Sequence, residues 1–89
     1  MNGLLITIVL ASFAINQEAI AQSRLLEDVK RNPDEAKSIC QNFRNLNKKN
    51  ISAGSKQSIQ KISNQKNISE GDAEILSMYV RGLYCPETF

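Results

Sequence analysis

The 89-residue chain contains no histidine and no tryptophan, and it has only two cysteines, two prolines and four glycines. Without histidine it lacks the commonest general base, the usual partner of a nucleophilic serine or cysteine, and the commonest metal ligand. The glycines form no phosphate-binding loop, and Cys40 and Cys85 are too far apart for the Cys-x-x-Cys pattern of redox enzymes. These absences argue against an enzyme and against a metal or cofactor site.

An apolar run over residues 4–15 is interrupted only by Thr7 and Ser12 and leads to Ala19-Ile20-Ala21. Small residues at these positions suit signal peptidase, and a run of this length is too short to span a bilayer as a helix. We therefore expect residues 1–21 to be a cleaved signal peptide, with no cysteine near the cleavage site to carry a lipid. The usual positive n-region is missing, so an uncleaved anchor and a buried core helix are the alternatives.

Residues 22–89 then form one small helical domain, whose net charge is 11 minus 8, or +3, because Glu18 leaves with the leader. A core of this size stabilises a fold by only about 3–5 kcal/mol. In an exported chain Cys40 and Cys85 have only each other as partners, and their disulfide would add roughly 4 kcal/mol by closing the loop between them. Two buried thiols, or one reactive thiol beside a bystander, are the alternatives.

Two helices are predicted in the first half of this domain. Residues 23–30 carry leucine and valine at helical spacing, and Asn32-Pro33-Asp34-Glu35 combines an N-cap, a first-turn proline and two acids. The apolar stripe that follows predicts the best helix of the chain, and it consists of Ala36, Ile39, Cys40, Phe43 and Leu46.

The pattern Lys-Asn-Ile-Ser-x-Gly occurs twice, at residues 49–54 and 66–71. In both copies the serine, Ser52 or Ser69, can cap a helix, and the preceding isoleucine is placed as a hydrophobic staple. We predict helices beginning at about residues 53 and 70, whether the copies reflect duplication or convergence on good capping chemistry.

The helix predicted from residue 53 is weakly amphipathic, whereas the one from residue 70 has a strong stripe and is stopped by Cys85-Pro86. Its stripe consists of Ala73, Leu76, Tyr79, Val80 and Leu83. No segment alternates apolar and polar residues as a strand does. The sequence therefore predicts an all-α fold, a small bundle of three to four helices stapled by one disulfide.

The segments Ser38-Ile39-Cys40, Ile68-Ser69 and Val80-Arg81-Gly82-Leu83-Tyr84-Cys85-Pro86 resemble a family of small exported bacterial proteins, domain of unknown function 732. The resemblance covers residues 25–87, and the richness in Asn, Lys, Ser and Ile marks a distant member. It implies a helical, exported domain with one disulfide, and it brings no activity or catalytic residue.

Two carboxylates close together can act as general acid and general base. The candidate pairs in this sequence are Asp34/Glu35 and Asp72/Glu74. Both pairs fall at the starts of predicted helices, where negative charge favours the helix dipole. We interpret them as structural.

Tyr79 and Tyr84, with Met78 nearby, could ligate haem in an exported carrier, because tyrosine and methionine are known axial ligands. They also fall on or beside the predicted apolar stripe, and core packing is the preferred interpretation.

The middle of the chain is basic and contains no acid between its first and last cation. Such a segment could bind an anionic envelope surface, whereas nucleic acid is not expected because the aromatics that stack bases are absent here. An ordinary solvated face is the alternative. The six basic residues are Arg44, Lys48, Lys49, Lys56, Lys61 and Lys66.

Asn50-Ile51-Ser52 and Asn67-Ile68-Ser69 match the N-glycosylation sequon, which would matter in a eukaryotic secretory host. The preferred hypothesis is a non-enzymatic exported domain of the periplasm or cell envelope, or outside the cell, that binds an anionic envelope surface or an envelope protein. A carrier of haem or lipid is the alternative, and a redox enzyme is a third.

Overall fold

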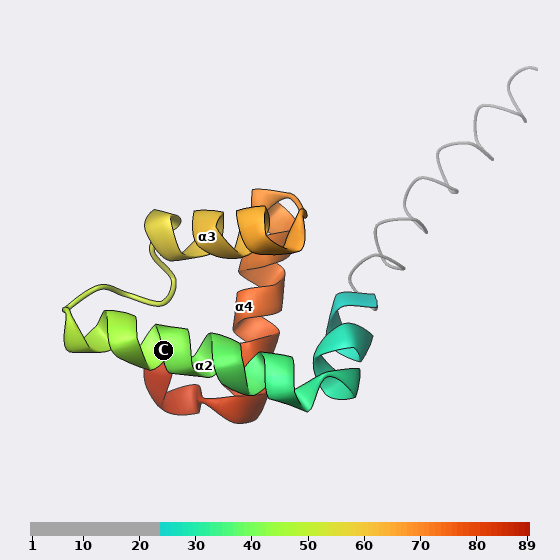
Figure 1. Cartoon of the computed structure of the whole chain (residues 1–89), viewed down its shortest axis with the longest axis horizontal. Helices are drawn as coiled ribbons and strands as arrows, with labels where there is room; N and C mark the ends of the chain where they lie inside the picture. The colour runs from blue at the N-terminus through green and yellow to red at the C-terminus, as the bar shows by residue number, and fades with distance from the viewer. Residues whose placement is uncertain (1–23) are drawn as a thin grey trace, which may run out of the picture.

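The computed structural model describes residues 24–89, and the predicted signal peptide over 1–21 lies outside the described residues. Residues 24–31 are helical, followed by α2 (Pro33–Lys48), α3 (Lys56–Lys66), α4 (Glu70–Tyr84) and the 3₁₀ turn η1 (Pro86–Thr88), as Figure 1 shows. No strand occurs in this part of the chain. The all-α prediction is confirmed.

Helix α4 is the element that packs against both α2 and α3, and η1 then turns back onto α2 (Figure 1). Phe43 of α2 and Val80 of α4 are among the largest fully buried side chains of the core. Burial of apolar area is the main force that holds such a bundle together. The rest of the buried apolar set is Val29, Ala36, Cys40, Ala53, Ile59, Ile62, Ala73, Leu76 and Cys85.

A disulfide joins Cys40 of α2 to Cys85, the residue that follows α4, across a Cα–Cα distance of 5.9 Å. The predicted pairing is therefore confirmed, and residues 24–89 contain no free cysteine. Both residues lie in the core. A redox enzyme needs an exposed, reactive thiol, so this arrangement gives that hypothesis no support.

The break between the helix over 24–31 and α2 is made by Asn32. It occupies the predicted N-cap position, but its side chain makes no capping bond to α2. Instead its Nδ2 donates to the carbonyl oxygen of Asp28 at 3.0 Å, and its backbone N–H donates to the same oxygen at 3.1 Å. Asn32 thus closes the preceding helix, while Pro33 begins α2 with its φ already near the helical value.

Each copy of the Lys-Asn-Ile-Ser pattern ends one helix before it begins the next element. Asn50 and Asn67 have φ values of 62° and 55°, in the left-handed region that ends many helices. The isoleucine after each asparagine donates its N–H five residues back, Ile51 to Leu46 O at 2.9 Å and Ile68 to Ser63 O at 3.1 Å. This 6→1 bond defines a Schellman motif, in which asparagine is the usual substitute for glycine.

The two copies differ in how the next helix begins. Helix α4 begins at Glu70 as predicted, with the Ser69 side chain accepting from the N–H of Asp72 at 3.0 Å. The predicted start at residue 53 is wrong, because α3 begins at Lys56 and its N-cap is Ser55. The intervening turn buries Ala53 completely, and this contact with the core delays the helix.

The expected stripe of α4 is also wrong at one position, since Leu83 is 51% exposed. The buried face of α4 instead includes two polar residues, Ser77 and Arg81, beside Leu76 and Val80. The helix is therefore rotated relative to the face that hydrophobic spacing predicts.

Candidate functional site

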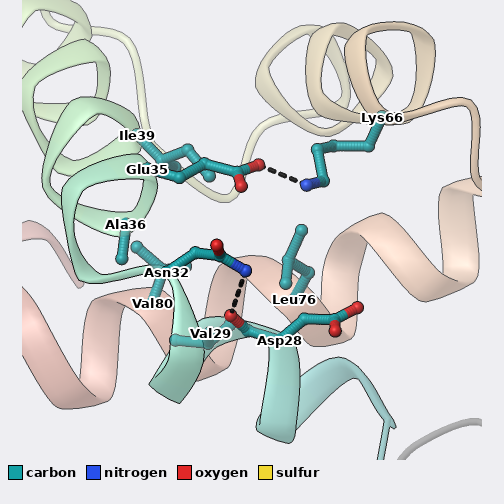
Figure 2. Close-up of a pocket in the computed structure, with 9 residues that line it drawn as sticks. All are labelled: Asp28, Val29, Asn32, Glu35, Ala36, Ile39, Lys66, Leu76 and Val80. Atoms are coloured by element: carbon teal, nitrogen blue, oxygen red, sulfur yellow. Dashed lines mark hydrogen bonds and ion pairs between the residues drawn. The ribbon is translucent and has the colours of Figure 1, made fainter.

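One hollow of the described chain is a cleft where the helix over 24–31 meets α2, with α4 beneath it (Figure 2). Its apolar lining consists of Val29, Ala36, Ile39, Leu76 and Val80. Its polar lining consists of Asp28, Asn32, Glu35 and Lys66.

An ion pair between Glu35 of α2 and Lys66 of α3 spans this cleft, and Figure 2 shows the two side chains pointing toward each other. The two side chains are 41% and 36% exposed, so the pair lies at the surface, where an ion pair contributes at most about 1 kcal/mol. On the other side of the cleft, Asn32 is bonded to the backbone of Asp28. The polar groups around the cleft are thus largely engaged with each other.

The cleft has a cavity volume of about 10 Å³, room for about one water molecule. Pockets that hold small molecules usually measure roughly 300–1,000 Å³. A second hollow, of about 440 Å³, falls within this range of volumes, but it is more open to solvent and its lining is mostly polar. Its lining residues are Gly54, Lys56, Ile59, Glu70, Gly71 and Glu74.

The residues considered as haem ligands line neither hollow. Tyr79 and Tyr84 are partly buried and pack against the core, as the preferred interpretation predicts. Met78 is 53% exposed. The arrangement therefore gives the haem-carrier hypothesis no support.

The two pairs of candidate carboxylates lie on different helices. Asp34 and Glu35 lie in the first turn of α2, and Asp72 lies in the first turn of α4, while Glu74 lies beyond it. Among residues 24–89 no group of three or more cysteine, aspartate or glutamate side chains could hold a metal ion.

The predicted basic residues fall into two classes. Arg44 and Lys66, the first and last of the set, form ion pairs with acids from outside the basic segment, Glu87 and Glu35. Arg44 Nε donates to Glu87 Oε1 at 2.7 Å, and this hydrogen bond holds the pKa of the Glu87 carboxyl below its usual range.

The other four basic residues are all exposed, and none takes part in an ion pair within residues 24–89. Lys48 ends α2, Lys49 follows it, Lys56 begins α3 and Lys61 lies in the middle of α3. The loop over 49–55 joins the end of α2 to the start of α3, so three of these lysines lie along one connection (Figure 1).

Asn50 and Asn67 of the two sequons are exposed. Their left-handed backbone conformation at helix ends accounts for asparagine at both positions without a sugar.

Arg81 is not among the residues that the sequence pattern singles out, yet it is only 9% exposed. Its Nε, like the Oγ of Ser77 one turn earlier, is buried and has no hydrogen-bond partner. Burial lowers the pKa of the Arg81 guanidinium. No signal in the sequence marks it, because hydrophobic spacing assigns apolar side chains to the buried face of a helix.

The described chain contains no helix that is both long enough and apolar enough for a membrane span. A protein-family model described as "Domain of unknown function (DUF8664)" matches residues 26–85. A domain of unknown function is thereby confirmed, whereas the family number 732 is not. Neither the curated proteins nor the solved structures yield a match.

Proposed function

The chain belongs to the DUF8664 family, a domain of unknown function, and from this premise we propose that it is an exported, non-enzymatic module that binds an anionic surface of the cell envelope. The single observation that carries the proposal is the set of four exposed lysines without an acid partner among residues 24–89, namely Lys48, Lys49, Lys56 and Lys61.

The separation of charge along the chain supports a binding role for this basic segment. The segment from Arg44 to Lys66 contains no acid, and the acids that do reach it pair only with its first and last cations. Lysines held near an anionic membrane contribute about 1 kcal/mol each, and the attraction acts within about one Debye length. Phosphate-bearing head groups are the occupant that this chemistry favours.

The leader and the disulfide support export. Residues 1–21 have the composition of a signal peptide, and disulfides persist mainly in oxidising compartments such as the periplasm and the cell exterior. The resemblance of the Tyr84-Cys85-Pro86 ending to a family of exported bacterial proteins points the same way. Intact-mass measurement of protein secreted through its own leader tests this part: we expect a chain beginning at Gln22 with both thiols oxidised.

Binding is tested by co-sedimentation of the secreted protein with vesicles that contain anionic or only zwitterionic phospholipid. We expect retention on anionic vesicles that falls as salt rises. Changing Lys48, Lys49, Lys56 and Lys61 to glutamine is expected to weaken this binding by roughly two to three orders of magnitude, since each lysine contributes about 1 kcal/mol.

A matched control changes four exposed cations outside the basic segment, Arg24, Lys30, Arg31 and Lys37, to glutamine. Both variants lose four positive charges, so a general effect of net charge would weaken the vesicle binding of both variants equally. The proposal requires the control to keep most of its binding. Equal losses in the two variants, or retention of wild-type protein that does not respond to salt, would contradict it.

A further inference from the structure

Arg81 carries a positive charge that no acid of the described chain matches. The three ion pairs within residues 24–89 use Arg31, Arg44 and Lys66, and none involves Arg81. Most of the side chain is buried, and its Nε is buried without a hydrogen-bond partner, which is costly for a charged group. The two terminal nitrogens, Nη1 and Nη2, are not among the buried unpartnered atoms, so they are the groups of this side chain that an outside ligand can reach.

The guanidinium nevertheless has a fixed place. Its Cζ lies 4.2 Å from the centroid of the Phe89 ring, a cation–π arrangement, and Phe89 itself is 68% exposed. The terminal nitrogens of Arg81 lie close to Gly54. If this glycine carried a side chain, its Cβ atom would be 3.4 Å from Nη1 and 3.7 Å from Nη2. The two terminal nitrogens are thus held beside the turn that leads into α3.

That turn is itself a favourable place for an anion. Helix α3 has no acid in its first turn, and Lys56 is its first residue. Ser55 accepts only from the N–H of Ser58, while the N–H of Ile59 bonds the Ser55 carbonyl, which leaves the N–H groups of Lys56 and Gln57 to other partners. Gly54 and Lys56 also line the second hollow, of about 440 Å³, so the turn borders open space.

We propose that Arg81, Lys56 and the N-terminus of α3 form a site for one phosphate group. The planar fork of arginine binds phosphate through two parallel hydrogen bonds, and a helix N-terminus adds N–H donors and a positive dipole end. Glu70 and Glu74 line the same hollow, and because their carboxylates repel an anion we place the phosphate at the Gly54 turn and not in the hollow itself. The inference rests on the proposed function, for which it names the group that recognises the head-group phosphate.

The test is a ¹H–¹⁵N NMR titration of the secreted protein with inorganic phosphate, with chloride at equal ionic strength as reference. We expect saturable shifts of the Arg81 Nε–H and of the amides of Lys56 and Gln57, and none with chloride. Absence of a saturable phosphate shift at these groups would overturn the inference.

The matched variants are Arg81→Lys and Arg44→Lys. Both keep the charge and lose the planar fork, but Arg44 is already paired with Glu87. We expect phosphate affinity to fall at least about tenfold in Arg81→Lys and to stay unchanged in Arg44→Lys. Equal affinities in the two variants would overturn the inference.

Should Arg81→Lys fail to fold, the surface variant Lys56→Gln tests the same site. An unchanged phosphate affinity in Lys56→Gln would also overturn the inference.

Vesicles of phosphatidic acid distinguish a lipid phosphate from a free one and separate this inference from the proposed function. A variant with glutamine at Lys48, Lys49 and Lys61 keeps the site, and we expect it to lose vesicle retention but to keep the phosphate shifts. Phosphate shifts in a wild-type protein that does not bind vesicles would overturn the proposed function and support a site for free phosphate. Wild-type vesicle binding that is unchanged in Arg81→Lys would overturn the lipid phosphate as the ligand of this site and leave the proposed function standing.

Discussion

Cys40 and Cys85 are joined across the packing of α2 on α4, and neither residue is more than 1% exposed. Val80 of α4 lies directly beside them, with its carbonyl oxygen 3.9 Å from both Sγ atoms. The bond therefore fixes the two helices at the centre of the core. A core of this size alone is only marginally stable.

Replacing both cysteines by alanine is expected to remove about 4 kcal/mol, the entropy that a loop of this length loses on cross-linking. Because the core alone contributes only about 3–5 kcal/mol, we expect the variant to lose roughly half of its stability and to unfold at a much lower temperature than the wild type. Circular dichroism during thermal unfolding measures this, with wild-type protein under reducing conditions as a second route to the same state. A variant that unfolds at the wild-type temperature would show that the core is sufficient by itself.

Asn67 ends α3 in the left-handed region, where an alanine is strained by about 1 kcal/mol and a glycine is not. We expect Asn67→Ala to lower the unfolding midpoint by roughly 4–8 °C and Asn67→Gly to leave it unchanged or raise it. The alanine and glycine variants together separate backbone strain from any contact of the asparagine side chain. Equal midpoints for alanine and glycine would contradict the assigned conformation.

The serines of the repeated pattern are expected to differ in their effects on stability. Ser69→Ala and Ser55→Ala each remove an N-cap and should lower the free energy of unfolding by about 1 kcal/mol. Ser52 accepts only from Gly54 within the turn, so Ser52→Ala should be milder. Urea unfolding of the three variants tests this order, and a larger loss for Ser52 would place the start of α3 at residue 53 after all.

The Arg44–Glu87 pair predicts a pH dependence. The pKa of Glu87 is lower in the folded chain than its ordinary value of about 4.3, because Arg44 donates a hydrogen bond to its charged form. The stability that this pair contributes is therefore fully present above the ordinary pKa and is lost as pH falls through the folded pKa. We expect Glu87→Gln to reduce stability at pH 6 by a small amount, and the difference from wild type to shrink below about pH 4.

Arg44→Gln should show the same narrowing, because it removes the other partner of the same bond. A difference between Glu87→Gln and wild type that stays constant down to the lowest pH would mean that protonation of Glu87 does not control this contact. Thermal unfolding at a series of pH values gives both curves.

Local signals determined most of what the sequence predicts correctly. Proline at residue 33, serine at residue 69 and Cys85-Pro86 act on the backbone within a few residues, and each marks a helix boundary that the structure has. The predicted start of α3 is wrong because both Ser52 and Ser55 can cap a helix, and the choice depends on Ala53 reaching the core. Such a contact depends on tertiary packing, which spacing along the chain does not encode.

The sequence predicts the candidate binding residues as a group of neighbouring cations, but it does not predict which of them form ion pairs. Six cations without an acid between them are visible in the sequence, but the acids that neutralise Arg44 and Lys66 lie far away along the chain, at Glu87 and Glu35. Arg81 could not be recognised because hydrophobic spacing assigns apolar side chains to a buried helix face. Its guanidinium lies over the Phe89 ring and beside the turn at Gly54, and both positions lie outside α4, so the spacing along α4 does not reveal them.

Helix α4 is the partner on which both α2 and α3 pack, and Cys85 follows its last turn. A nascent chain therefore has nothing to fold against until this helix has been synthesised. Until then Cys40 also has no second thiol with which to pair, because Cys85 follows α4. We therefore expect folding and formation of the disulfide to be completed only after the last helix has been synthesised.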